Sequence, residues 1–153
     1  MSATPLTPMQ GVAVEALVAA GRIRRVPVDD RRAADFLAIA DERLAELAGI
    51  RSDVVRLGVA YDAAHDVGEA VLAAYGYGTV NGPGQHAAVG DFLVALVDAP
   101  PAAVAAAVQF DRIRRARNQQ NYRGAAVGAG TAASVEAVAR ALRMVADERR
   151  IGT

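Results

Sequence analysis

The sequence predicts an all-α fold, an up-and-down antiparallel helical bundle that forms a single domain over residues 1–153. Apolar residues recur at the spacing of one helical face through most of the chain, and prolines, glycines and aspartates stand where such helices begin or end. Alternation of apolar and polar residues, the pattern of a strand, never continues for more than a few positions. Hydrophobic residues make up 53% of the chain, which is enough for one sizeable core but not for two.

The first 28 residues are predicted to form a short helix and a turn, ahead of a bundle in residues 29–150. The apolar-rich stretch from about Pro8 to Ala20 is followed by a glycine, which favours a helix that stops there. The next segment, GRIRRVP, is strongly basic, and we expect it to be an exposed turn.

Two longer helices are indicated by their capping residues and apolar stripes. Asp29 or Asp30 can cap the second helix, whose apolar side chains recur with a period of 3.6 residues until the glycine of LAG. Ser52 or Asp53 can cap the third helix, which continues to about Tyr75 at the segment YGYG. These two helices are the clearest elements of the pattern.

The second half of the chain is predicted to hold three more helices. The segment TVNGPGQHAAVG has the composition of a loop, and a short fourth helix over DFLVALV ends at two prolines. Pro101 suits the first turn of a fifth helix with the interior AAVAAAVQFDRIRRARNQQNY. After the glycine-spaced GAAVGAG, Thr131 or Ser134 begins a last amphipathic helix.

The predicted core consists of the residues on the apolar stripes of these helices. They are Phe36, Leu37, Leu44, Leu47, Val55, Val59, Phe92, Leu96, Phe110, Ile113, Val138 and Leu142. Their burial against one another is what we expect to hold the antiparallel helices together.

Charge and composition argue against several classes of protein. Seventeen acidic residues balance seventeen basic ones, so attraction to nucleic acid or membrane must come from a local patch. There is no cysteine for disulfide or thiolate chemistry, and charged residues interrupt every apolar run before it reaches the length of a membrane span. The N-terminus MSATPLTPMQ lacks the pattern of a signal peptide, so we expect a cytoplasmic protein with no membrane partner.

A polar motif, RRARNQQNYRG over residues 114–124, ends the fifth helix. Phe110, Ile113 and Arg117 fall on one helical face, so Arg117 continues a buried stripe and is expected to point inward. Burying a guanidinium group costs several kcal/mol unless it is paired or hydrogen-bonded. Arg117 is therefore either a structural residue that caps a helix or pairs with an acid, or a residue that binds an anionic ligand.

A second polar group lies on the third helix, in YDAAHDVGEA. Tyr61 and His65 share one face, and the carboxylates of Asp62, Asp66 and Glu69 share another. Metal binding is the less favoured interpretation, because the two histidines of the chain lie on different segments and such acids are usually a solvated face. One of these carboxylates is instead expected to pair with the arginine of the fifth helix. The glycine loop NGPGQHAAVG matches no phosphate- or dinucleotide-binding pattern, so we expect no metal or cofactor.

These features together resemble the HEPN family, the higher eukaryotes and prokaryotes nucleotide-binding domains. The resemblance rests on the helix YDAAHDVGEAVLAAYGY, a glycine-rich link with GQH, and a late helix in which RN is followed by three residues and Y, and it covers residues 54–122. It implies an up-and-down bundle, commonly a homodimer in which the polar motifs of both subunits face one cleft. Many members are metal-independent RNA endonucleases, often toxins, and others are paired with a nucleotidyltransferase.

The active motif of the family is an arginine, usually followed by a polar residue, with a histidine four to six residues later. Here the arginine is Arg117, the polar residue is Asn118, and Tyr122 takes the place of the histidine. Histidine titrates near neutrality, whereas tyrosine, with a pKa of about 10, is a poor base. His86 offers an imidazole, but its expected loop position argues against it.

The resemblance therefore assigns Arg117, Asn118 and Tyr122 as candidate catalytic residues. Arg117 would stabilise the charge on phosphate and Asn118 would orient it. The candidate RNA-binding residues around them are Arg114, Arg115, Asn121 and Arg123.

The predicted function is that of a HEPN-type RNA-binding protein or metal-independent ribonuclease, acting as a homodimer in a toxin–antitoxin or defence system. The alternative is a non-catalytic protein-interaction partner, an antitoxin or modification target of a nucleotidyltransferase. A third possibility is a purely structural helical dimer.

Overall fold

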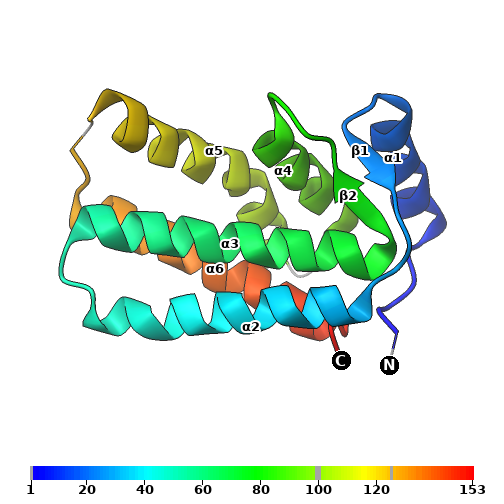
Figure 1. The fold of residues 1–153 in the computed structure, drawn as a ribbon, viewed down its shortest axis with the longest axis horizontal. Helices are drawn as coiled ribbons and strands as arrows, with labels where there is room; N and C mark the ends of the chain where they lie inside the picture. The colour runs from blue at the N-terminus through cyan, green and yellow to red at the C-terminus, as the bar shows by residue number, and fades with distance from the viewer. Residues whose placement is uncertain (1, 99–100, 125) are drawn as a thin grey trace.

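The computed structural model describes residues 2–98, 101–124 and 126–153, and within them the side chains of all but Tyr122 and Arg123. The helices and strands are α1 (Pro8–Ala19), β1 (Ile23–Arg25), α2 (Asp30–Glu46), a 3₁₀ turn (Leu47–Gly49), α3 (Asp53–Tyr75), β2 (Tyr77–Thr79), α4 (Gln85–Leu96), α5 (Pro101–Arg123) and α6 (Ala129–Glu148). Helices dominate this part of the chain, so the predicted all-α bundle is confirmed (Figure 1).

Side-chain caps begin the first three helices where the sequence predicts them. Thr7 and Gln10 form a reciprocal capping box at the start of α1. Asp29 Oδ1 accepts a hydrogen bond from the Arg32 backbone N–H at 2.9 Å, and Ser52 caps α3 in the same way. Each cap satisfies a backbone donor that the first turn of a helix leaves free.

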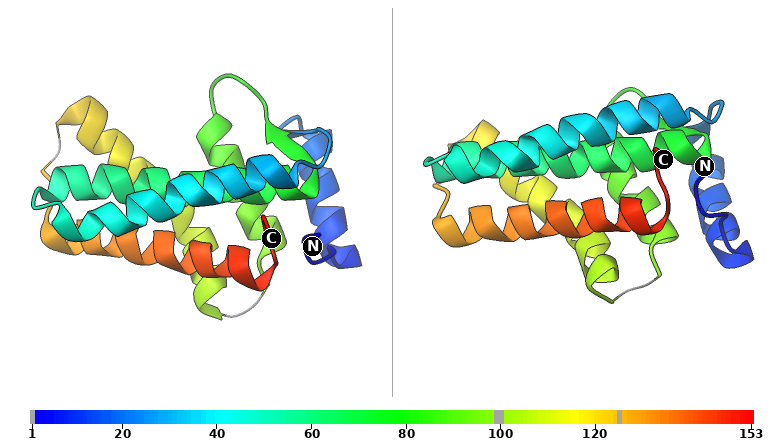
Figure 2. Two further views of the ribbon diagram at one scale, coloured as in Figure 1. Left: turned by 60° about the horizontal axis from the view of Figure 1, so that its bottom comes forward. Right: turned by 90° about the horizontal axis from the view of Figure 1, so that it is seen from below.

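Helix α3 is the central element of the bundle. It packs most extensively against α2, which runs antiparallel to it, and against α6 (Figures 1 and 2). Its other faces meet α4 and α5, so most side chains between Ala60 and Ala74 are buried. Helix α3 therefore contacts four other helices, and its polar residues lie among them.

The predicted core is confirmed in most of its members, and one residue was placed wrongly. Phe36 and Val59 are partly buried against the core, whereas the side chain of Val55 is 50% exposed. Val55 stands two residues before the buried Leu57, which puts it on the opposite side of α3. The remaining predicted residues are buried: Leu37, Leu44, Leu47, Phe92, Leu96, Phe110, Ile113, Val138 and Leu142.

The segment predicted to be an exposed basic turn contains a short strand instead. Strand β1 pairs antiparallel with β2, with Ile23 opposite Thr79, and Ile23 is buried. Three residues are too few for an alternating pattern to be visible in the sequence. Gly76, which ends α3 with a positive φ of 78°, turns the chain into β2, and any Cβ there would lie 3.0 Å from the Val26 carbonyl oxygen.

Two predicted helix starts were placed too late. Helix α4 begins at Gln85, so His86 lies in its first turn and not in a loop. The start is hidden in the sequence because its N-cap, Gly84, has no side chain to signal it and follows the loop-like residues NGP. Helix α6 likewise begins at Ala129, ahead of the predicted Thr131 or Ser134. None of the helices in the described ranges is long and apolar enough to cross a membrane.

Candidate functional site

A pocket of about 260 Å³ lies between the first turn of α4 and the C-terminal half of α5. Its lining includes three residues of the predicted motif, Arg114, Arg117 and Asn118, together with His86 from α4. The other lining residues are Gly82, Gly84, Gln85 and Ala87. The motif on α5 therefore shares one pocket with a histidine from a different helix.

Arg117 lies between α3 and the pocket, with its side chain 27% exposed. Its guanidinium carbon is 5.3 Å from the centre of the Tyr61 ring, which is a cation–π contact. Its Nη2 donates to Asp62 Oδ1 at 3.3 Å, so the predicted pairing of this arginine with a carboxylate of the third helix is confirmed. Asp62 also pairs with Arg43 Nη1 of α2 at 3.2 Å. Two guanidinium groups thus share the Asp62 carboxylate, and one of them, Arg43, also contacts Asp66.

The arginines before Arg117 repeat this arrangement. Arg114 Nη2 donates to Asp111 Oδ1 at 2.6 Å, and Arg115 Nη2 lies 2.5 Å from the other oxygen, Asp111 Oδ2. These hydrogen bonds, the one from Arg114 above all, lower the pKa of the Asp111 carboxyl. Arg114 lines the pocket, whereas the side chain of Arg115 is 68% exposed and is not among its lining residues.

The remaining predicted site residues of the motif are Asn121, Tyr122 and Arg123. Asn121 is exposed, and with its amide oriented to satisfy both atoms its oxygen accepts from Arg117 Nε at 3.3 Å. It therefore positions Arg117 and is not among the lining residues of the pocket. The side chains of Tyr122 and Arg123, predicted to act in catalysis and in RNA binding, lie outside the described residues.

A cluster of aromatic rings joins His86 to α3. The Tyr61 hydroxyl and His86 Nδ1 are 2.8 Å apart and share a hydrogen bond. The rings of His65 and His86 stack with their centres 4.2 Å apart. The two helices can approach closely because Gly68 of α3 faces Val89 of α4, and a Cβ at Gly68 would overlap Val89 Cγ1.

Burial keeps the rings of this cluster uncharged at neutral pH. It lowers the pKa of His65 to about 4 and also lowers that of His86, and the nearby charge of Arg117 adds to both effects. Burial raises the pKa of Tyr61 to about 12, so its hydroxyl keeps its proton. His86 is therefore a neutral imidazole that can accept a proton.

The acidic face of α3 is not the solvated surface that its spacing suggested. Asp66 and Glu69 are each only 8% exposed, because α2 covers this side of α3. Asp66 Oδ2 lies 3.2 Å from Arg43 Nε, and burial raises the pKa of Asp66 to about 6. No cluster of three metal-ligating side chains occurs within the described ranges.

His65 and His86 are the site residues that sequence reasoning missed or set aside. The signal was present, because GQH belongs to the segment that carries the resemblance and His65 stands one helical turn after Tyr61. Their meeting depends on how α3 and α4 pack, which no local pattern encodes. Together the cluster and the pocket combine two guanidinium groups, two side-chain amides and two neutral imidazoles.

Comparison of the chain with models of protein families, with curated proteins and with solved structures finds no match. The chemistry of the pocket is therefore the basis for a function. Its cationic and amide donors suit an anion with several oxygens, and its imidazole suits proton transfer next to that anion.

Proposed function

We propose that this pocket binds single-stranded RNA and cleaves it without a metal ion, as the resemblance to the HEPN family implies. The observation that carries the proposal is that His86 lies in the same pocket as Arg114, Arg117 and Asn118. Guanidinium groups bind phosphate oxygens strongly, and they stabilise charge that develops on phosphate during the reaction. A neutral imidazole is the side chain best suited to take a proton at neutral pH.

The cleavage step uses the ribose as its own nucleophile. In the tautomer that carries its proton on Nδ1 and donates it to the Tyr61 hydroxyl oxygen, His86 keeps a free lone pair on Nε2. Nε2 takes the proton of a ribose 2′-hydroxyl, the 2′-oxygen bonds to the adjacent phosphorus, and the bond from phosphorus to the 5′-oxygen breaks. The leaving 5′-oxygen takes a proton from water, so the products are a 2′,3′-cyclic phosphate and a 5′-hydroxyl.

In this scheme His86 supplies the imidazole that the family motif places at the position of Tyr122. Arg117 and Asn118 bind the phosphate oxygens and stabilise the charge of the pentavalent state. Asp62 and the Tyr61 ring hold Arg117 in place, and Arg117 still lines the pocket.

The test is cleavage of a labelled single-stranded RNA by the purified protein in the presence of EDTA. We expect a 2′,3′-cyclic phosphate product, and no cleavage of the DNA oligonucleotide of the same sequence, which lacks the 2′-hydroxyl. Replacement His86→Ala should lower the cleavage rate by about 10²–10⁴-fold while RNA binding persists. Arg117→Ala should weaken both binding and cleavage, whereas Arg31→Ala, at an exposed arginine on α2, should change neither.

The outcomes separate the candidate functions. RNA that is bound but not cleaved would remove the catalytic part of the proposal and leave an RNA-binding protein. RNA that is neither bound nor cleaved would contradict the proposal as a whole and favour the alternative, a protein-interaction partner of a nucleotidyltransferase.

A further inference from the structure

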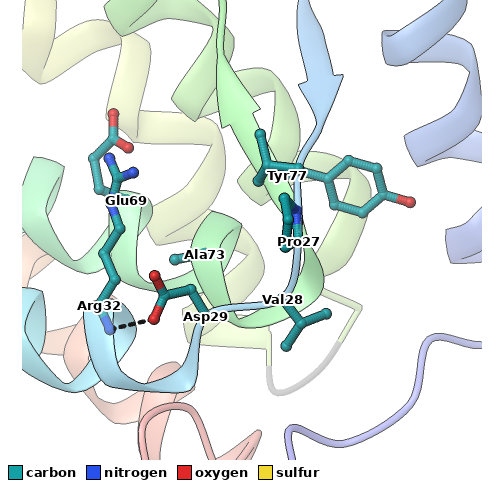
Figure 3. A pocket seen from close by; sticks show the side chains of 8 residues that line it. Pro27, Val28, Asp29, Arg32, Glu69, Ala73 and Tyr77 are labelled. Carbon is teal, nitrogen blue, oxygen red and sulfur yellow. Dashed lines mark hydrogen bonds between the residues drawn. The ribbon is translucent and has the colours of Figure 1, made fainter.

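A second pocket, of about 200 Å³, lies between the segment that joins β1 to α2 and the middle of α3 (Figure 3). It is lined by Val26, Pro27, Val28, Asp29, Arg32, Glu69, Ala73 and Tyr77. None of these residues lines the pocket assigned to RNA. The two pockets are therefore separate sites on the chain.

Glu69 is a buried acid with no hydrogen-bond partner in the described chain. Its side chain is only 10% exposed, and His65 Nε2 lies 3.8 Å from Glu69 Oε1. His65 is neutral at pH 7, so this contact is no ion pair. Burial raises the pKa of Glu69, and the charge of Arg32 partly offsets that effect. A buried carboxylate without donors is unfavourable, and a ligand that supplies N–H groups removes this penalty.

Arg32 brings a donor to the same end of the pocket. The side chains of Arg32 and Glu69 overlap in the view of Figure 3, and the positive charge of Arg32 acts on the Glu69 carboxyl group. Among the described residues the Arg32 guanidinium group makes a cation–π contact, at 5.4 Å from the centre of the Phe36 ring, and no hydrogen bond. Its five N–H donors are therefore available to a ligand.

Part of the wall of this pocket is apolar, and backbone hydrogen bonds hold that part in place. Pro27, Val28 and Ala73 line it beside Glu69 and Arg32, whereas the ring of Tyr77, another lining residue, points away from these two groups (Figure 3). The linker that carries Pro27 and Val28 is fixed to α3 at both ends, since Val26 N–H donates to the Gly76 carbonyl and Asp29 N–H donates to the Ala73 carbonyl. The pocket is thus already formed before any ligand arrives.

We propose that this second pocket binds a neutral planar ligand with N–H donors next to a carbonyl oxygen, and that the guanine base is its best match. A carboxylate only accepts hydrogen bonds and a guanidinium group only donates them. Guanine presents two adjacent N–H donors, N1–H and N2–H, to the two oxygens of Glu69, and its O6 accepts from Arg32.

The charge and the volume of the pocket both limit which ligands it can bind. An anion would be repelled by Glu69 and Asp29, whose two negative charges exceed the one positive charge of Arg32. A neutral ligand that donates to Glu69 and accepts from Arg32 suits both of these groups. The volume is several times the ~30 Å³ share of one water molecule. It lies below the roughly 300–1,000 Å³ of sites for drug-sized ligands, which suits a single ring system between apolar walls.

The test uses guanosine as the probe, titrated into the full chain at neutral pH and followed by isothermal titration calorimetry. We expect saturable binding at one site for each chain. Methylation of N1 removes one donor, so 1-methylguanosine should bind at least about tenfold more weakly. Glu69→Gln should weaken guanosine binding to a similar extent, and so should Arg32→Gln, while Glu42→Gln, at an exposed acid on α2, should not.

Three results would overturn this proposal. They are the lack of saturable guanosine binding to the wild-type protein, equal affinity for guanosine and 1-methylguanosine, and unchanged affinity in folded Glu69→Gln and Arg32→Gln variants. The methylated probe needs no variant, and Arg32 is exposed, so a folding defect of Glu69→Gln does not block the test. RNA cleavage assayed on the same proteins reports on the other pocket, so failure of one proposal is distinguishable from failure of the other.

Discussion

Arg117 is held from two sides, by the Tyr61 ring and by the Asp62 carboxylate. An arginine on a buried stripe could leave an unpaired buried acid when it is removed, at a cost of about 3–5 kcal/mol. In the structure the side chain of Asp62 is 37% exposed and keeps Arg43 as a partner. The function of Arg117 can therefore be separated from its contribution to stability.

We predict that Arg117→Ala lowers the free energy of unfolding by no more than about 1–2 kcal/mol, the sum of a partly exposed ion pair and a cation–π contact. Urea denaturation at pH 7 measures it, with Arg31→Ala as the matched arginine control. A loss of 3 kcal/mol or more would mean that Asp62 depends on Arg117, and that the arginine is chiefly structural.

His65 and Asp66, neighbours on α3, respond to pH in opposite senses. Burial lowers the pKa of His65 to about 4, so between pH 6.5 and 4 the unfolded chain binds a proton that the folded chain does not, and acidification destabilises the fold. Burial raises the pKa of Asp66 to about 6, so between pH 6 and 4 the folded chain binds the extra proton, and acidification stabilises the fold. The two effects oppose each other over this range.

A variant without His65 should show the stabilising effect of Asp66 protonation alone. We predict that His65→Leu gains stability relative to the wild-type protein as the pH falls from 7 to 4, by up to about 3 kcal/mol. Leucine suits the site because His65 Nε2 is buried without a hydrogen-bond partner in the described chain. Denaturant midpoints at several pH values measure the difference, and parallel pH profiles for the two proteins would show that His65 titrates normally.

At the scale of the elements, the position of His86 depends on how closely α4 approaches α3. Gly68 lies at their contact, where a Cβ would overlap the buried and stiff side chain of Val89. Gly58, on the same helix, has no atom within 4 Å of where its Cβ would stand. The two glycines therefore share helix propensity and differ in packing.

We predict opposite effects of the same substitution at these glycines. Gly68→Ala should destabilise the protein by about 1–3 kcal/mol through overpacking, and should move His86 relative to Tyr61. Gly58→Ala should stabilise it by up to about 1 kcal/mol, since alanine favours the helix. Thermal unfolding of the two variants measures both effects. Stabilisation by Gly68→Ala as well would mean that α4 shifts at little cost to accommodate the new methyl group.

At the scale of the whole molecule, a large apolar side chain remains exposed on α5 and another on α6. Val108 is 59% exposed and Met144 is 62% exposed, although soluble monomers usually keep exposed apolar patches small. The same helix α5 carries Arg114 and Arg117. A twofold pairing through this region would bring two copies of the pocket toward one cleft.

We predict a homodimer at micromolar concentration, with RNA affinity that falls steeply as salt is added because bound counterions are released. Sedimentation velocity measures the oligomeric state, and RNA titrations at several salt concentrations measure the salt dependence of the affinity. A stable monomer would contradict the predicted dimer. An RNA affinity that does not change with salt concentration would contradict binding through the arginines.

The sequence predicts a helix start where a capping side chain marks it, and misses the start where no such side chain is present. Thr7, Asp29 and Ser52 accept hydrogen bonds from the first turns that follow them, so the starts of three helices are visible in the sequence. Gly84 carries no such side chain, so the start of α4 was missed, and with it the place of His86. For strand β1, three residues are too few to show a period.

By itself, the sequence determined that the chain is helical, where most of its helices lie, and that Arg114, Arg117 and Asn118 form one polar motif. Each of these properties depends on residues within a few turns of one another. Periodicity indicates which face of a helix is buried, but it does not say which helix covers that face.

Only the tertiary structure decided which distant groups meet. The packing of α3 against α4 placed His65 and His86 in one stack, and the packing of α2 against α3 buried Glu69 in a pocket with Arg32. The burial that shifts the pKa values of His65 and Asp66 also arises from neighbouring helices, not from adjacent residues. Such contacts join positions far apart in the chain, and they form only when whole helices pack, so no local pattern could specify them.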